Sequence, residues 1–143
     1  MPLSSWLLWA LLSAVFAALT AIFAKLGLQG VDADLATLIR TAIIIIALGC
    51  FVWLAGKWRD PLQLSARTWL FLTLSGLATG ASWVCYFRAL QLGDASRVAP
   101  VDKLSVVLVA LFAMVFLAER PGARDWLGIA LVGGGAVILA LRP

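Results

Sequence analysis

The sequence predicts an all-α, polytopic integral membrane protein with five transmembrane helices in one bundle. Of the 143 residues, 64% are apolar and only 13% are charged, whereas an average soluble domain has about 25% charged residues. Five long apolar stretches follow one another along the chain, and a bilayer core about 30 Å thick requires roughly 20 apolar residues in a helix. This composition excludes a soluble globular protein, a disordered chain and a nucleic-acid-binding protein.

The five stretches define the expected helices of a single domain over residues 1–143. We expect helices at about 3–24, 35–56, 68–88, 97–118 and 125–141. The first is expected to be a membrane helix rather than a cleaved signal peptide, because no basic segment precedes it and no A-x-A site follows. The second is apolar except for Arg40, and the fourth is apolar except for Asp102 and Lys103. The third is uncharged over most of its length, and the fifth is uncharged but short.

Short connections join these stretches, so we expect simple turns at the membrane surface. Acidic and hydroxyl residues stand where helix N-caps are expected: Asp34, Asp94 or Ser96, and Asp125. Pro100 permits two interpretations. It begins the fourth helix, where a missing N–H matters least, or it lies inside a helix that has already started and bends it.

The distribution of basic residues does not decide the orientation of the chain. We name the side of the membrane where the first span begins side A, and the opposite side B. Side A is expected to hold Lys57, Arg59, Arg67, Arg120 and Arg124, and side B Lys25, Arg88, Arg97 and Arg142. The positive-inside rule favours neither orientation for counts this similar, so a single orientation and dual topology both remain open. Six tryptophans map to side A, namely Trp6, Trp9, Trp53, Trp58, Trp69 and Trp126.

Ionisable residues inside the bilayer are functional candidates because they are energetically unfavourable there. Arg40, Asp102 and Lys103 fall at similar depth just inside side B, with Lys25 and Arg88 at helix ends on that side. A short aspartate cannot reach the headgroups, so we expect Asp102 to pair with Arg40, Lys103 or Arg88. The excess positive charge fits an anionic or zwitterionic ligand, while snorkelling to lipid phosphate is the alternative. Asp102 is also a candidate proton carrier.

Trp83 and Tyr86 are three residues apart and share a face of the third helix. Aromatic walls with a few polar groups are typical of small-molecule pockets, although packing and interfacial anchoring are alternatives. The predicted substrate-binding residues are therefore Arg40, Trp83, Tyr86, Arg88, Asp102 and Lys103. The chain has no histidine, and we expect no catalytic residues, no metal site and no cofactor. Cys50 and Cys85 are expected to behave as small hydrophobic residues.

Small residues predict close helix–helix contacts. They recur in three groups, namely Ser13, Ala17 and Ala21; Gly76 and Gly80; and Gly128 with Gly133, Gly134 and Gly135.

The segment from Trp83 to Gly128 resembles the EamA-like unit of the drug/metabolite transporter superfamily. The matching features are Phe87-Arg88-Ala89-Leu90, then Val98 and Pro100, then Glu119-Arg120, and finally Trp126-x-Gly128. The resemblance implies half of a ten-helix inverted-repeat transporter, because most members of the superfamily contain two such units. It therefore implies an antiparallel homodimer for a chain with one unit.

These observations favour a secondary transporter or exporter of a small metabolite or drug-like solute, working by alternating access. The alternative is a non-transporting membrane subunit that packs with a partner protein and stabilises it. No paired carboxylates or histidine indicate an enzyme. We expect a multi-pass protein of the inner (plasma) membrane, whose partners are a solute, lipid and a second copy of the chain.

Overall fold

The computed structural model describes residues 5–141, and their only regular secondary structure is helical. The elements in chain order are α1 (Ser5–Gly27), α2 (Ala33–Leu54), the 3₁₀ helix η1 (Pro61–Gln63), α3 (Ala66–Leu92), α4 (Ala95–Asp102), α5 (Ser105–Phe116) and α6 (Ala123–Ala140). Five segments are long and apolar enough to cross a membrane, and the fourth consists of α4 and α5 together. The predicted fold class is therefore confirmed for the described residues. The expected helix start at residue 3 and Arg142 lie outside them.

The start of α2 corrects one predicted cap. Asp32, and not Asp34, is the N-cap residue, since its Oδ1 accepts hydrogen bonds from the backbone N of Asp34 (2.9 Å) and of Leu35 (3.1 Å). Asp32 has the extended backbone that an N-cap requires. Asp34 lies in the first turn, so its carboxylate remains available for another contact. The helix begins two residues before the expected position for this reason.

The other two predicted caps differ from each other. Asp94 is the N-cap residue of α4, but its side chain makes no capping hydrogen bond. Asp125 lies inside α6, whose N-cap is Gly122. The Asp125 carboxylate accepts a 2.7 Å hydrogen bond from the backbone N of Gly122. Asp125 therefore accepts a hydrogen bond from a free backbone N–H at the helix start, although it lies within the first turn. The prediction that Asp125 is the N-cap residue is wrong.

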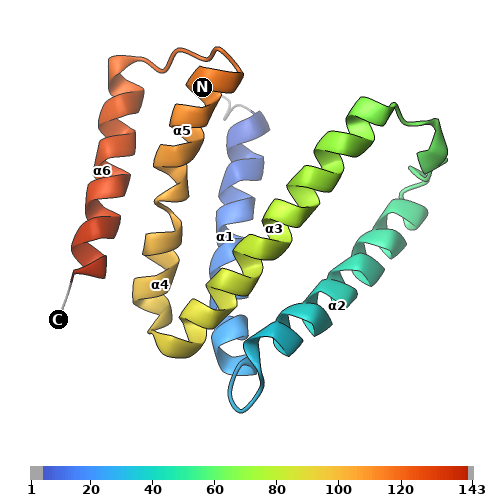
Figure 1. The fold of residues 1–143 in the computed structure, drawn as a ribbon, viewed down its shortest axis with the longest axis horizontal. Coiled ribbons are helices and arrows are strands. Elements are labelled where there is room, and N and C mark those ends of the chain that lie inside the picture. The colour runs from blue at the N-terminus through green and yellow to red at the C-terminus, as the bar shows by residue number, and fades with distance from the viewer. Residues whose placement is uncertain (1–4, 142–143) are drawn as a thin grey trace. The chain divides into compact units, whose positions relative to one another are not determined.

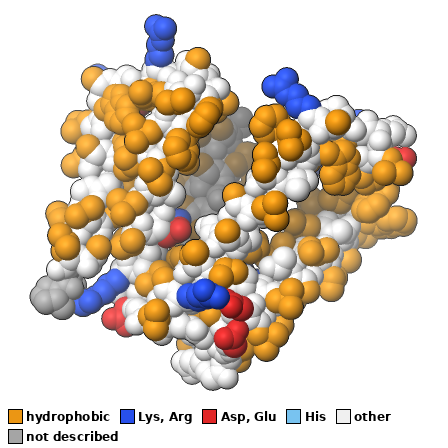
Figure 2. Space-filling model, viewed as in Figure 1, with side chains coloured by type: hydrophobic (Ala, Val, Ile, Leu, Met, Phe, Trp, Pro, Cys, Tyr) orange, Lys and Arg blue, Asp and Glu red, His pale blue; other side chains and the backbone are white. Residues whose placement is uncertain are grey.

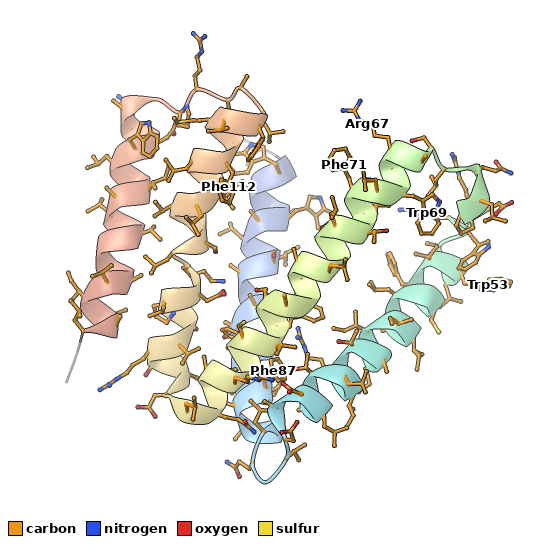
Figure 3. The ribbon with its side chains drawn as sticks, viewed as in Figure 1. Trp53, Arg67, Trp69, Phe71, Phe87 and Phe112 are labelled. Atoms are coloured by element: carbon orange, nitrogen blue, oxygen red, sulfur yellow. The ribbon has the colours of Figure 1, made fainter. Side chains whose placement is uncertain are left out.

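The connection between α2 and α3 is more ordered than the simple turn expected. Asp60 caps η1 by accepting a 2.9 Å hydrogen bond from the backbone N of Leu62. The indole Nε1 of Trp69 donates to the backbone carbonyl of Pro61 at 3.1 Å. The Ser65 hydroxyl accepts from the backbone N of Thr68 at 3.1 Å, which caps α3. Figure 3 shows Trp69 beside this connection at the start of α3.

The fourth span is two helices rather than the single helix expected over residues 97–118. The backbone N of Lys103, Leu104 and Val106 each donate to a carbonyl three residues earlier at 3.0 Å, which tightens the chain between α4 and α5. α4 starts at Ala95, so Pro100 lies inside it. The interpretation of Pro100 as the helix-starting residue is therefore wrong. Its role as a bend remains a prediction.

The described chain divides into two compact units. The hairpin unit comprises Leu26–Gln91, and the bundle unit comprises the chain up to Lys25 together with the residues from Leu92 onward. In the hairpin unit, α2 and α3 run antiparallel and are joined through η1 (Figure 1). In the bundle unit, α4 and α5 both pack against α6.

The predicted small-residue faces have different surroundings. Gly133 is buried, and a Cβ added there would lie 3.0 Å from Cγ2 of Val107, so α5 approaches α6 closely at this glycine. A Cβ at Gly76 or Gly80 would meet no described atom within 4 Å. The third helix therefore has open space along its glycine pair.

Most large apolar side chains of the described residues are exposed. They cover the helix surfaces in Figure 2, while the charged side chains lie mainly near the ends of the helices. Leu90 and Phe87 are exceptions, with 0% and 3% exposure. Because apolar surface of this extent is unfavourable in water, it is the surface of a multi-pass membrane protein.

Candidate functional site

Polar contacts join α2 to α3 along one seam of the hairpin unit. The Gln91 side chain donates to the carbonyl of Val31 at 2.6 Å, and one turn further along Arg88 reaches Asp34. The antiparallel course of the two helices then places Arg40 beside Trp83. The seam therefore contains three of the predicted site residues, namely Arg40, Trp83 and Arg88.

Arg40 contacts aromatic rings rather than a carboxylate. Its guanidinium carbon lies 4.1 Å from the ring centre of Trp83 and 5.2 Å from that of Phe87. Trp83 and Phe87 are four residues apart, so they project from the same face of α3. Tyr86, the other predicted aromatic residue, lies next to Phe87 on α3, with 6.5 Å between the centres of the two rings. Thus α2 supplies the cation, and α3 supplies the two rings, of which Trp83 was predicted for an aromatic wall and Phe87 was not.

Phe87 is a member of this group that was not predicted from the sequence. The signal was its spacing of four residues from Trp83, which places both rings over neighbouring turns. Phe87 is 3% exposed, and Figure 3 labels it at the lower end of α3, where α3 faces α2. A buried phenylalanine beside a cation is a contact that residue spacing alone cannot distinguish from ordinary packing.

Arg88 forms a bidentate ion pair with Asp34. The Nε of Arg88 donates to Oδ1 at 3.0 Å, and Nη2 donates to Oδ2 at 2.6 Å. The predicted pairing of Arg88 with Asp102 is not found, because the guanidinium of Arg88 binds Asp34 instead. The side chains are 60% and 50% exposed in the isolated chain. Asp34 is not among the predicted partners, because its position before an apolar run is also that of a helix N-cap.

Asp102 pairs with its neighbour in the chain. The Nζ of Lys103 lies 3.1 Å from Oδ2 of Asp102, so of the three predicted partners Lys103 is the one found. Both residues stand where α4 ends and the chain tightens before α5. Asp102, Lys103 and Pro100 belong to the bundle unit, and Arg40, Trp83, Tyr86 and Arg88 belong to the hairpin unit.

Lys25 is held by hydrogen bonding. Its Nζ donates to the carbonyl of Gly93 at 2.7 Å, within the bundle unit. Snorkelling into lipid headgroups, the alternative considered for this lysine, is therefore not needed to explain its position. The contact ties the end of α1 to the turn before α4.

A separate pocket of about 460 Å³ lies in the bundle unit between α5 and α6. Its walls are mainly apolar, from Val109 and Ala113 of α5 and Ile129 of α6, while Glu119 and Arg120 of the connection line it as well. None of the predicted site residues lines this pocket.

Comparison with known proteins gives one consistent family. The model of the EamA-like transporter family matches residues 4–141. A protein of Sinorhizobium sp named "Uncharacterized transporter in cobO 3'region" is 57% identical over 137 residues, which are 96% of this chain and 97% of that protein. No solved structure matches significantly.

Two more distant relatives differ in length. "Uncharacterized transporter YxxF" of Bacillus subtilis (strain 168) is 25% identical over 98% of this chain, but the match covers only 44% of that protein. A Pseudomonas fluorescens protein named "Probable 4-amino-4-deoxy-L-arabinose-phosphoundecaprenol flippase subunit ArnE" is 27% identical over 69% of this chain and 96% of its own length. With the family model matching nearly the whole sequence, this chain belongs to the EamA-like transporter family of the drug/metabolite transporters.

Proposed function

We propose that this chain is a secondary transporter that moves a small solute by alternating access, as an antiparallel homodimer in the inner membrane. The observation that carries the proposal is the length of this chain compared with that of a relative. The chain matches 44% of the Bacillus subtilis relative with 98% of its own residues, a length that supports one unit here against two units in that protein. An odd number of spans inverts each successive unit, and two inverted copies supply the repeat that such transporters use.

In this proposal the solute-binding residues are Arg40, Trp83, Tyr86 and Arg88 of the hairpin unit and, separately, Asp102 and Lys103 of the bundle unit, where Pro100 provides a bend. Arg40 is the charged group with aromatic neighbours, and Trp83 forms the wall against it. The Asp34–Arg88 pair sets the register of α2 against α3. Alternating access then requires the two copies to exchange conformations, so that one site opens to each side in turn.

Labelling of single cysteines tests the antiparallel arrangement. The background carries Cys50→Ser and Cys85→Ser, and cysteine is introduced in turn at Gln63 in the α2–α3 connection and at Gln29 before α2. We expect a membrane-impermeant thiol reagent added from outside to label about half of the molecules at each position, because both orientations are present. Complete labelling at one position and none at the other would contradict the homodimer.

Solute exchange tests the transport activity directly. Purified protein in liposomes is offered radiolabelled glutamate, lysine and glucose 6-phosphate, and the dye ethidium, so that anionic, cationic and drug-like solutes are represented. We expect exchange of at least one of them above empty liposomes. Arg59→Gln, which removes a loop charge in the same unit, is the matched control for Arg40→Gln, which we expect to abolish exchange.

A second candidate function is that of a non-transporting subunit. It is favoured by the name of the Pseudomonas relative, which describes that protein as a flippase subunit. A subunit would show one orientation by cysteine labelling and no exchange alone. It would co-purify from the membrane with a second, oppositely inserted protein.

A further inference from the structure

Arg40 differs from the other cationic residues of the predicted site because no acceptor for it is found in the described part of the chain. Its contacts are the rings of Trp83 and Phe87, and no hydrogen bond or ion pair of Arg40 is found among residues 5–141. Arg88, by contrast, is bound by Asp34, and Lys103 by Asp102. The guanidinium of Arg40 therefore retains its whole charge and all its N–H donors.

The carboxylates of the hairpin unit are already engaged. The unit contains Asp32, Asp34 and Asp60 and no glutamate. Asp32 caps α2 and Asp60 caps η1, each through backbone N–H groups. Asp34 binds Arg88 through both of its oxygens. The unit itself therefore offers Arg40 no counter-charge.

The donors of Arg40 are also accessible. Within the described part of the chain, every buried side-chain nitrogen or oxygen has a hydrogen-bond partner. The unbonded guanidinium nitrogens of Arg40 are consequently not sealed in the interior. These nitrogens keep some exposed surface, while the guanidinium lies against the rings of Trp83 and Phe87.

The geometry favours one class of ligand. An aromatic ring attracts a guanidinium through its face, and this contact leaves the N–H groups at the guanidinium edge free. That edge is a planar fork that matches the two oxygens of a carboxylate or phosphate. A cation inside a membrane span is unfavourable without a partner, so an oxyanion is the group that completes the site.

We infer that Arg40 binds an oxyanion, phosphate or carboxylate, at its guanidinium edge, with Trp83 and Phe87 as the platform. The same chemistry comes from two sources, a soluble solute or a lipid headgroup. That the transported solute is itself anionic rests on the proposed function, whereas the binding of an oxyanion at Arg40 does not.

The test is an NMR titration that observes this residue directly. The protein is labelled with ¹⁵N-arginine and held in an uncharged maltoside detergent, which offers no phosphate or carboxylate. The Nε–Hε signal of Arg40 is identified by its loss in Arg40→Lys. Inorganic phosphate is then added in one arm and phosphatidylglycerol in the other. Arg67 is the internal control, because it lies 5.9 Å from the ring of Phe71 in the same unit, at the other end of α3.

We expect a saturable shift of the Arg40 signal and none of the Arg67 signal. Saturation by inorganic phosphate identifies a soluble anion, and saturation by phosphatidylglycerol alone identifies a lipid headgroup. Trp83→Leu should raise the Kd for the saturating ligand about three- to tenfold, because the platform is lost. Trp83→Phe should retain most of the affinity.

The inference is overturned if the Arg40 signal responds to neither ligand, or no more than that of Arg67. A carboxylate supplied by a second copy of the chain would give this result. The titration of the unsubstituted protein needs no variant of the platform, so misfolding of Trp83→Leu cannot obscure it. A failure of solute exchange in liposomes leaves this binding measurement unaffected.

Discussion

At the scale of residues, the Asp34–Arg88 pair is the strongest polar contact between α2 and α3. It uses two hydrogen bonds of 3.0 and 2.6 Å. Exposed ion pairs contribute little in water, but the two side chains are exposed in the isolated chain, without a membrane around it. In a membrane the solvent around the pair is partly lipid, where an unpaired charge is unfavourable. Loss of one partner should therefore matter more than loss of a loop charge.

We predict that Asp34→Asn and Arg88→Gln each lower the melting temperature of the protein in liposomes. The exchanged pair Asp34→Arg with Arg88→Asp should recover most of the loss, since the opposite charges meet again. Arg59→Gln, on the α2–α3 connection, should have almost no effect. Melting of the two single variants at the temperature of the parent would show that the pair does not hold the helices together.

At the scale of elements, the contact of α5 with α6 depends on one glycine. Gly133 faces Val107, whereas a Cβ at its neighbour Gly134 would meet no described atom within 4 Å. Both glycines lie inside α6, so replacement by alanine changes helix propensity equally. A difference between the two variants therefore reports packing alone.

We predict that Gly133→Ala is less stable than Gly134→Ala by about 1 kcal/mol, because Val107 must shift to accept the added methyl group. The measurement is the fraction folded against the mole fraction of a denaturing detergent. If Gly134→Ala is the less stable variant, the face of α6 that carries Gly134 packs against something outside the described chain.

The interruption between α4 and α5 is a second feature at this scale. Pro100 has no N–H, so the carbonyl of Ser96 loses its helical partner, and the chain tightens three residues later. A proline inside a helix destabilises the helix by about 3 kcal/mol. This loss of stability is acceptable in a protein whose function requires a bent helix.

We predict that Pro100→Ala gives a more stable protein that exchanges solute more slowly, because the helix is straightened. Unfolding in denaturing detergent and exchange in liposomes are measured on the same preparation. Pro121→Ala, in the α5–α6 connection, should leave exchange unchanged. Undiminished exchange by Pro100→Ala would remove Pro100 from the mechanism.

At the scale of the whole molecule, orientation decides which assembly the chain can form. The similar basic-residue counts of the two sides leave the direction of insertion undetermined. A few added charges should therefore be enough to choose it.

We predict that lysines at Leu62 and Gln63 insert the chain in one orientation, and lysines at Gln29 and Ser96 in the other. Each variant alone should fail to exchange solute, and co-expression of the two should restore exchange. Alanines at the same positions are the control. Full activity of either locked variant alone would contradict the antiparallel dimer.

The sequence by itself determined the membrane class, the number of spans and the family. Each rests on properties that act over long stretches of chain: apolar runs near the thickness of a bilayer, and an ordered series of motifs from Trp83 to Gly128. The sequence also singled out Arg40 and Trp83, which the structure places in contact, because a charge or an isolated aromatic residue stands out in an apolar run.

Only the tertiary structure decided which residues contact each other. Asp32 and Asp34 are two residues apart and chemically alike, and the backbone geometry assigns one to the cap and the other to Arg88. Phe87 contacts Arg40 because α3 faces α2 at that turn. Contacts between helices depend on rotation and register, which an apolar run leaves free, since almost every side chain along it is favourable in lipid.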